Sequence, residues 1–226
     1  MALPAEKERY TFADILAWDE NERAEIIDGE TVMMAPPSSI HQEIAAELTR
    51  QFGNYLEGKR CKVYPAPFGV RLFERDGDAP EDVDTMVEPD ISVVCDRSKI
   101  DNHGCKGAPD LVIEILSPST RRHDRLVKLN LYQRAGVREY WIVDPEYKSV
   151  QVFTQDGGGS LNLHEDYGRE DVAKVNVLDG CFIELSKVFP EEAAQRARDH
   201  SPALCCPSMY AVSLATIFPL SVIKTS

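Results

Sequence analysis

The clearest pattern of hydrophobic and polar positions lies between residues 109 and 144. It begins with a nearly continuous apolar run over residues 111–116, which is typical of a β-strand covered on both faces. A helical stretch follows and ends at Gly136, and residues 138–144 form a second run rich in aromatic and β-branched side chains. Strand, helix and strand in this order predict two parallel neighbours joined by a crossover helix.

One charged residue, Glu114, stands in the middle of the first predicted strand. Burying an ionised carboxylate without partners costs several kcal/mol, so Glu114 must be paired, be protonated or hold a metal ion. In the helix, Asp124, Lys128 and Tyr132 are spaced at i, i+4 and i+8 and share one face, which gives Lys128 a fixed direction. Apolar surface elsewhere on this helix is expected from Leu126, Val127, Leu129 and Leu131.

A short helix capped by Thr11 and a β-hairpin are predicted near the N-terminus. Residues 24–28 and 30–35 flank Asp28-Gly29, a strong signal for a tight turn between antiparallel strands. We expect these strands to start the main sheet.

A longer helix is predicted next, beginning with a capping box of Ser39 and Gln42 and reaching about Leu56 along an apolar stripe. Strand candidates at residues 61–64 and 68–73 are interrupted by two prolines, so at least one of them should lie at a sheet edge.

Residues 74–88 carry seven acidic side chains and one basic one, and their composition predicts a mobile acidic loop. Residues 89–95 form the next predicted strand, which opens on Asp90, and residues 96–108 are expected to be a loop. Further strands are expected to complete the sheet at residues 149–154, 172–177 and 181–185.

Length and charge limit the functions open to the chain. Its 226 residues suit one well-filled core with room for a tail. A net charge of −13 excludes a broadly basic surface wrapped around nucleic acid, so any contact with DNA must be local.

The six cysteines show no C-x-x-C pair or zinc spacing and are expected to be reduced thiols. No secretory signal is recognisable, which predicts a cytoplasmic protein.

Two carboxylates and a lysine are expected around the central strands. Asp90 opens one strand, Glu114 lies inside the next, and Lys128 is on the helix that returns across the sheet. Hard oxygen ligands with open positions suit Mg²⁺ or Mn²⁺, which neutralises a phosphodiester and lowers the pKa of an attacking water. A lysine beside such a site acts as a point charge. The set therefore predicts metal-dependent hydrolysis of phosphodiester bonds.

At these residues the chain resembles the PD-(D/E)xK nuclease superfamily and, more closely, the Uma-type family of putative restriction endonucleases. The resemblance implies a restriction-endonuclease-like α/β fold, with a mixed central sheet flanked by helices, and a Mg²⁺-dependent endonuclease acting on DNA. It extends from about residue 10 to about residue 185. The matching segments are Pro89-Asp90, Pro109-Asp110, the run EILSPST from Glu114, then Asp124, Lys128 and Tyr132, and the run GVREYWIVDP from Gly136.

The resemblance also implies roles for single residues. Asp90 and Glu114 would be metal ligands, and Glu43 on the first long helix would be a third acid. The superfamily's lysine stands two residues after the strand carboxylate, where this chain has Leu116. Members of the superfamily can supply the amine from the following helix, and Lys128 would then orient the hydrolytic water.

Ordinary structural roles compete with these assignments. A buried ion pair with Lys128 or an arginine would explain Glu114 equally well. Lys128 is also at the right spacing to pair with Asp124 on the helix surface. Charged residues beside an apolar stripe, such as Glu43, are usually solvated.

Two further features concern the predicted site. Asp110 follows a proline, as Asp90 does, and shares a strand face with Glu114. We favour Asp90, because metal bridging in this fold uses carboxylates from two adjacent strands.

The basic cluster near the site either contacts a phosphate backbone or forms a solvated helix end. It consists of Arg121, Arg122 and Arg125.

We therefore predict one restriction-endonuclease-like domain over residues 1–190 and a C-terminal extension over residues 191–226. Residues 201–223 are uncharged, but their prolines and serines argue against a membrane helix. Cleavage of both strands of a duplex would favour a homodimer. The alternative function is that of a non-catalytic protein of nuclease fold that binds nucleic acid or a protein partner.

Overall fold

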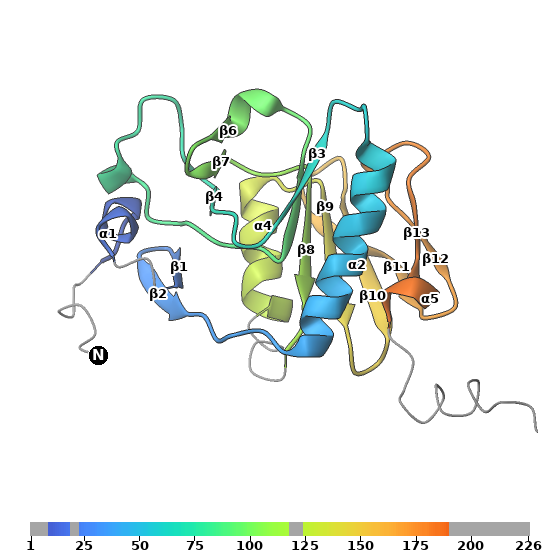
Figure 1. Cartoon of the computed structure of the whole chain (residues 1–226). Coiled ribbons are helices and arrows are strands. Elements are labelled where there is room, and N and C mark those ends of the chain that lie inside the picture. The colour runs from blue at the N-terminus through green and yellow to red at the C-terminus, as the bar shows by residue number, and fades with distance from the viewer. Residues whose placement is uncertain (1–8, 19–22, 118–123, 190–226) are drawn as a thin grey trace, which may run out of the picture. The chain divides into compact units, whose positions relative to one another are not determined.

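The computed structural model describes residues 9–18, 23–117 and 124–189 (Figure 1). The predicted C-terminal extension over residues 191–226, including its uncharged segment, lies outside these ranges. Within them, no helix combines the length and the hydropathy that crossing a bilayer requires.

A six-stranded mixed sheet forms the centre of the fold, in the order β11-β10-β9-β8-β5-β3. The strands β8 (Leu111–Ile115) and β9 (Glu139–Asp144) are parallel neighbours, which confirms the predicted strand–helix–strand unit. The other neighbouring pairs in this sheet are antiparallel. The remaining strands are β3 (Lys62–Pro65), β5 (Ile91–Val94), β10 (Ser149–Gln155) and β11 (Leu161–Gly168).

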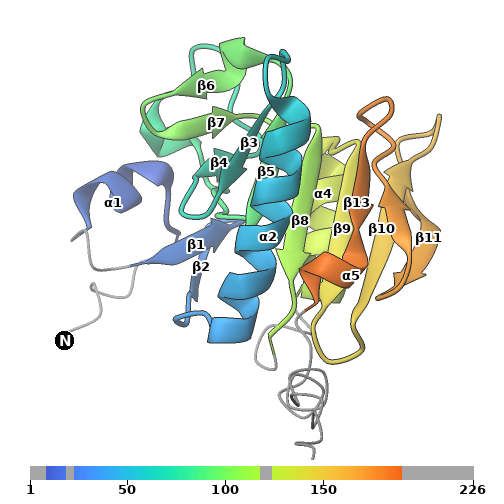
Figure 2. The ribbon, with the colours of Figure 1, turned by 45° about the vertical axis from the view of Figure 1, so that its right-hand side comes forward.

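Two helices cover opposite faces of this sheet (Figure 2). The helix α2 (Ser39–Leu56) packs on one face, where Phe52 meets Trp141 edge to face. The crossover helix packs on the other face. Its described part consists of a π-helical turn, η3 (Asp124–Lys128), followed by α4 (Leu129–Ala135). Gly136 ends it in a left-handed conformation with φ of 83°, as its position in the sequence predicts.

The helix α2 starts one residue earlier than the capping box predicts. Its N-cap is Ser38, whose hydroxyl accepts a hydrogen bond from the backbone N–H of His41 at 3.2 Å. The predicted role of Ser39 as the cap is therefore wrong, because Ser39 already has helical geometry. Of the predicted stripe, Ile40 is half exposed. The buried residues of α2 are Ile44, Leu48, Phe52 and Leu56.

Two predicted hairpins form but do not join the main sheet. The strands β1 (Ala24–Ile27) and β2 (Glu30–Met33) turn at Asp28-Gly29, where φ is 51° and 88°. The strands β12 (Val172–Lys174) and β13 (Phe182–Glu184) make another two-stranded sheet, followed by α5 (Leu185–Val188). The prediction that these hairpins start and complete the main sheet is wrong, because its edges are β3 and β11.

Other strands lie where the sequence predicts none. The edge strand β11 carries mostly exposed side chains, so it lacks the apolar pattern by which strands are recognised. A small three-stranded sheet combines one strand inside the predicted strand at residues 68–73 with two strands that replace part of the predicted loop at residues 96–108. It consists of β4 (Val70–Arg71), β6 (Ile100–Asp101) and β7 (Gly104–Lys106).

The acidic loop is anchored in its second half. After a 3₁₀ turn, η1 (Pro80–Asp82), the backbone N–H groups of Met86 and Val87 donate to the carbonyls of Ile26 and Val70 at 2.8 and 3.0 Å. Val83 is also buried, and its carbonyl accepts from the first residue of α1 (Phe12–Ala17). This segment therefore connects α1, the first hairpin and the small sheet.

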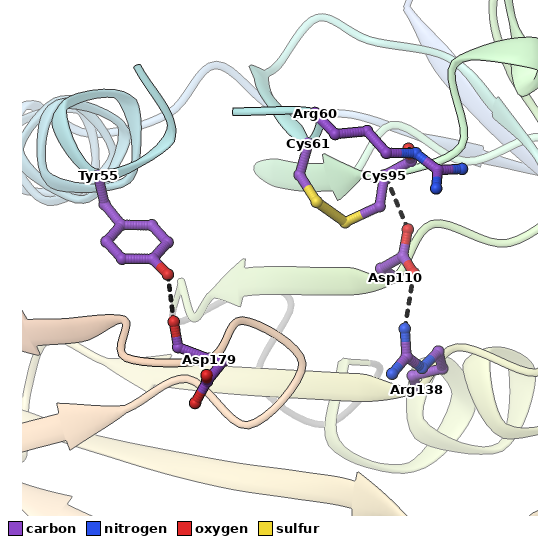
Figure 3. Close-up of a disulfide and its surroundings, with 7 residues drawn as sticks. All are labelled: Tyr55, Arg60, Cys61, Cys95, Asp110, Arg138 and Asp179. Atoms are coloured by element: carbon purple, nitrogen blue, oxygen red, sulfur yellow. Dashed lines mark hydrogen bonds and ion pairs between the residues drawn. A yellow bond between two sulfur atoms is a disulfide. The ribbon is translucent and has the colours of Figure 1, made fainter. Parts of the chain in front are cut away.

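A disulfide joins Cys61 and Cys95, which corrects the prediction that all six cysteines are reduced thiols (Figure 3). The pairing of β3 with β5 sets Lys62 opposite Val94, and the next pair in the same register is Cys61 and Cys95. The chain spacing of 34 residues carries no signal for this bond, because only the strand pairing brings the two residues together.

Two other cysteines, Cys105 and Cys181, are free and buried. Burial raises the pKa of the Cys105 thiol to about 11 and that of the Cys181 thiol to about 12. Both are therefore poor nucleophiles at neutral pH.

Reducing the Cys61–Cys95 bond should lower the free energy of unfolding by about 2–4 kcal/mol, because the bond restricts the unfolded chain. Urea unfolding with and without reductant measures the change. The double variant Cys61→Ser/Cys95→Ser should have the same free energy of unfolding as the reduced protein, and adding reductant should not change it. A wild-type protein whose unfolding is insensitive to reductant would contradict the prediction.

Candidate active site

Glu114 points from β8 to the face of the sheet that α4 covers. Side chains alternate along a strand, and its neighbours Val112 and Leu116 belong to the core on that face. Glu114 is only 4% exposed. Leu116, where the superfamily pattern has its lysine, is buried among apolar side chains. The strand therefore cannot supply the amine at that position.

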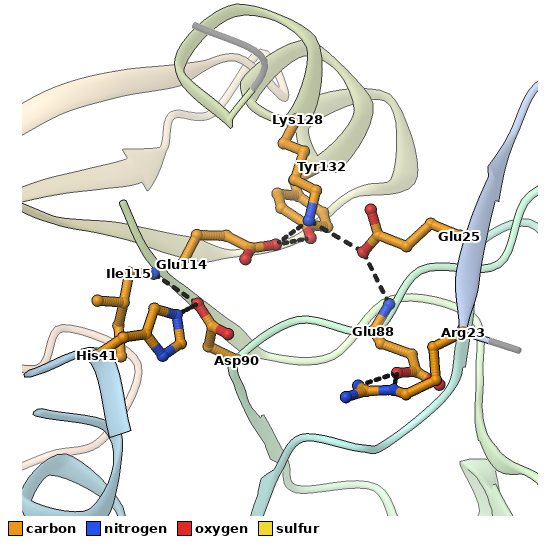
Figure 4. Close-up of polar contacts among 9 residues, drawn as sticks. All are labelled: Arg23, Glu25, His41, Glu88, Asp90, Glu114, Ile115, Lys128 and Tyr132. Carbon is orange, nitrogen blue, oxygen red and sulfur yellow. Dashed lines mark hydrogen bonds and ion pairs between the residues drawn. The ribbon is translucent and has the colours of Figure 1, made fainter. Parts of the chain in front are cut away.

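The amine comes from the crossover helix. Lys128 Nζ lies 2.8 Å from Glu114 Oε1, and the Tyr132 hydroxyl donates to the same oxygen at 2.6 Å (Figure 4). Burial raises the pKa of the Tyr132 phenol well above its usual value, and the negative charge of Glu114 adds to the shift. Tyr132 therefore stays protonated and remains a donor. The spacing of Lys128 and Tyr132 predicts their shared direction, and the structure confirms it.

A second buried carboxylate, Glu25, contacts the same lysine. Glu25 Oε1 lies 3.0 Å from Lys128 Nζ and accepts the backbone N–H of Glu88 at 3.0 Å. Sequence reasoning missed Glu25, although the signal was present: it is a single charged residue inside the short apolar strand AEII, as Glu114 is inside LVIEI. Ionised, Glu25, Glu114 and Lys128 together carry one net negative charge, which favours binding of a cation.

Asp90 lies beside Glu114 on the neighbouring strand. The pairing of β5 with β8, continued by one residue, sets Asp90 opposite Glu114, so the two carboxylates come from neighbouring strands at the same end of the ladder. Asp90 Oδ2 accepts the backbone N–H of Ile115 at 2.7 Å and contacts His41 Nε2 at 3.1 Å. Its other oxygen, Oδ1, accepts no hydrogen bond from the described residues.

Two other predicted acids are not part of this group. Asp110, the alternative to Asp90, accepts the backbone N–H of Cys95 at 2.8 Å and pairs with Arg138 at 3.0 Å (Figure 3). It therefore fixes the other end of β8. Glu43 is exposed on α2 and makes no hydrogen bond or ion pair with the cluster in the described part of the chain. From α2 it is His41 that reaches Asp90.

The basic cluster can be placed only in part. Arg121 and Arg122 lie outside the described residues, and of Arg125 only the backbone, in η3, is described. The two residues after it, Leu126 and Val127, are 59% and 41% exposed. Both therefore present apolar surface to solvent, while Lys128 occupies the buried side of this turn.

The donor set determines which metal could bind. The described residues contain no group of three or more His, Cys, Asp or Glu side chains arranged to hold a metal ion. Asp90 and Glu114 offer two carboxylates from neighbouring strands. Mg²⁺ is usually held by one or two carboxylates, while water and substrate phosphates fill its other positions. The pair therefore fits Mg²⁺ or Mn²⁺, with the remaining positions open to water and substrate.

The mixed sheet with helices on both faces belongs to the restriction-endonuclease-like class of α/β folds. Residues 12–186 match the Uma2 family, whose description is "Putative restriction endonuclease". The chain therefore belongs to this family, and the resemblance and the fold inferred from it are confirmed.

Two proteins of Synechocystis and one solved structure are similar to the chain. The chain is 27% identical over 149 residues to the uncharacterized protein slr1290 of Synechocystis, covering 65% of this chain and 74% of that protein. It is 22% identical over 163 residues to the uncharacterized protein sll1609 of the same organism, covering 70% and 88%. A crystal structure of a putative nuclease belonging to DUF820 from Anabaena variabilis aligns with a TM-score of 0.61 and 19% identity, over 80% of this chain and 97% of that one.

Replacing Lys128 with methionine should lower the free energy of unfolding by about 3–5 kcal/mol, because Glu25 and Glu114 lose the ammonium that they share. Adding Glu25→Gln should recover part of this loss, since it removes one of the two buried charges. Urea unfolding of the single and double variants tests both statements. A Lys128→Met protein as stable as the wild type would show that the lysine does not hold the cluster together.

Proposed function

We propose that the protein is a Mg²⁺- or Mn²⁺-dependent endonuclease that hydrolyses phosphodiester bonds in DNA. One observation carries the proposal: a lysine from the crossover helix lies 2.8 Å from the buried strand carboxylate of Glu114, beside a second carboxylate at Asp90. Membership of the Uma2 family and the name of the Anabaena variabilis relative support the same reaction class.

The metal ligands in this proposal are Asp90 and Glu114. When bound, the ion would supply charge neutralisation at the phosphate and a more acidic water. The protein keeps both carboxylates oriented: Tyr132 donates to Glu114 and the Ile115 backbone N–H donates to Asp90. Such fixed neighbours hold a site in its productive geometry.

Lys128 is the third group of the proposed site. Its ammonium would hold the hydrolytic water or a phosphate oxygen and stabilise the negative charge that develops there. Because the side chain is only 6% exposed, it acts in a surrounding of low dielectric constant, where a charge has a larger effect than in water. A role for Glu43 as a third acid stays a prediction without a supporting contact.

Cleavage of a duplex also requires access to both strands. A homodimer would place one site on each strand, and this is the assembly we propose for the active protein. A non-catalytic protein of the same fold is the alternative, in which the Glu114–Lys128 pair serves stability alone.

Glu114→Gln and Asp90→Asn should abolish plasmid nicking in Mg²⁺ or Mn²⁺, and Lys128→Met should lower turnover per folded molecule by about 10²–10³. A matched control is Glu139→Gln, which removes a buried carboxylate bonded to Trp141 on the opposite face. This variant should nick plasmid at the wild-type rate per folded molecule. Wild-type protein that nicks under no metal would contradict the proposal, as would Lys128→Met protein that is less stable but equally active.

DNA binding should be weak and steeply salt-dependent, because a chain of net charge −13 repels the duplex except at a few basic residues. Arg122→Glu and Arg125→Glu should each weaken it. The control is Lys187→Glu, which reverses an exposed charge on α5. Fluorescence anisotropy across a salt series measures the effect; binding that survives both arginine reversals would exclude this cluster from the interface.

A further inference from the structure

We propose that Glu25 is a positioning residue: it gives the Lys128 ammonium a second anchor, so that the amine stays in the site when Glu114 binds a metal ion. The inference rests on the proposed function and concerns a residue that neither the sequence pattern nor the family resemblance assigns. It extends the site from the central sheet to the separate β1–β2 hairpin.

Lys128 contacts two buried carboxylates. Its Nζ atom lies 2.8 Å from Glu114 Oε1 and 3.0 Å from Glu25 Oε1, and the three side chains are 3–6% exposed. The ammonium therefore bridges carboxylates from two different sheets (Figure 4). A lysine that served only to neutralise Glu114 would not need a second buried acid, whose desolvation is costly.

The Lys128 ammonium and a metal ion would compete for the Glu114 carboxylate. The ammonium donates to Glu114, which is one of the two proposed metal ligands. With a single partner, the amine would have to be pulled away from Glu114 before a cation could use that carboxylate. Glu25 offers the ammonium an alternative acceptor next to the first, which lowers the cost of freeing Glu114 and keeps the positive charge near the phosphate.

Glu25 is itself well fixed. The Glu88 backbone N–H donates to the same oxygen, Oε1, at 3.0 Å. The next residue of the strand, Ile26, exchanges two backbone hydrogen bonds with Met86, each 2.8 Å long. The hairpin therefore holds the Glu25 carboxylate in place, as positioning a lysine requires.

Isothermal titration calorimetry with Mn²⁺ alone, on the full chain without DNA, tests the inference on four proteins. These are the wild type, Glu25→Gln, Lys128→Met and the double variant. Glutamine keeps an acceptor for the Glu88 N–H, so the fold should survive. We expect Glu25→Gln to weaken Mn²⁺ binding about tenfold, as for the loss of one charge-assisted hydrogen bond, because the ammonium then stays on Glu114.

In the Lys128→Met background the same Glu25→Gln change should alter the Mn²⁺ affinity less than about threefold, since no amine remains to compete. The control is Glu30→Gln, which removes an exposed charge from the same hairpin and should leave the affinity unchanged.

Two results would overturn the inference while leaving the proposed function intact. An equal loss of affinity in both backgrounds would mean that Glu25 attracts the cation directly. Unchanged affinity in Glu25→Gln would mean that it has no part in metal binding. Wild-type protein that binds no Mn²⁺ and nicks no DNA would instead contradict the proposed function itself, and the role of Glu25 with it.

Discussion

The fold is organised around one costly feature, the carboxylate of Glu114 buried inside the central sheet. An isolated charge in that position would be strongly destabilising, so the surrounding elements have to supply its partners. The crossover helix supplies Lys128 and Tyr132, and the first hairpin supplies Glu25, which meets the same ammonium. The buried charge of Glu114 therefore links its strand and the helix that follows to a hairpin whose Glu25 lies 103 residues before Lys128. Such clusters are also where metal and phosphate chemistry takes place.

The sheet and the hairpin contribute differently to this cluster. Strand pairing sets Asp90 opposite Glu114, and the backbone N–H of Ile115 holds the Asp90 carboxylate. This part of the site is as rigid as the sheet. The hairpin depends on its bridge to the acidic loop, through which Glu88 reaches Glu25. A substitution in the hairpin can therefore change the position of the Lys128 ammonium without moving the carboxylates of Asp90 and Glu114.

Local patterns predict the parts of the structure that local interactions determine. The strand–helix–strand unit, the turn at Asp28-Gly29 and the direction of Lys128 all follow from periodicity and turn chemistry. Sheet membership, the Cys61–Cys95 bond and the contact of Glu25 with Lys128 depend on which strands pair across long stretches of chain. Neither periodicity nor spacing carries that information. The placement of Glu25 in an apolar strand shows that buried acids can still be recognised in advance.

The most direct test of the central claim is a crystal structure grown with Mn²⁺ and measured at a wavelength where manganese scatters anomalously. The account predicts one anomalous peak bound by Asp90 and Glu114, with Lys128 still in contact with Glu25. No peak at saturating Mn²⁺, or a peak bound by other residues while Lys128 remains paired with Glu114, would contradict it.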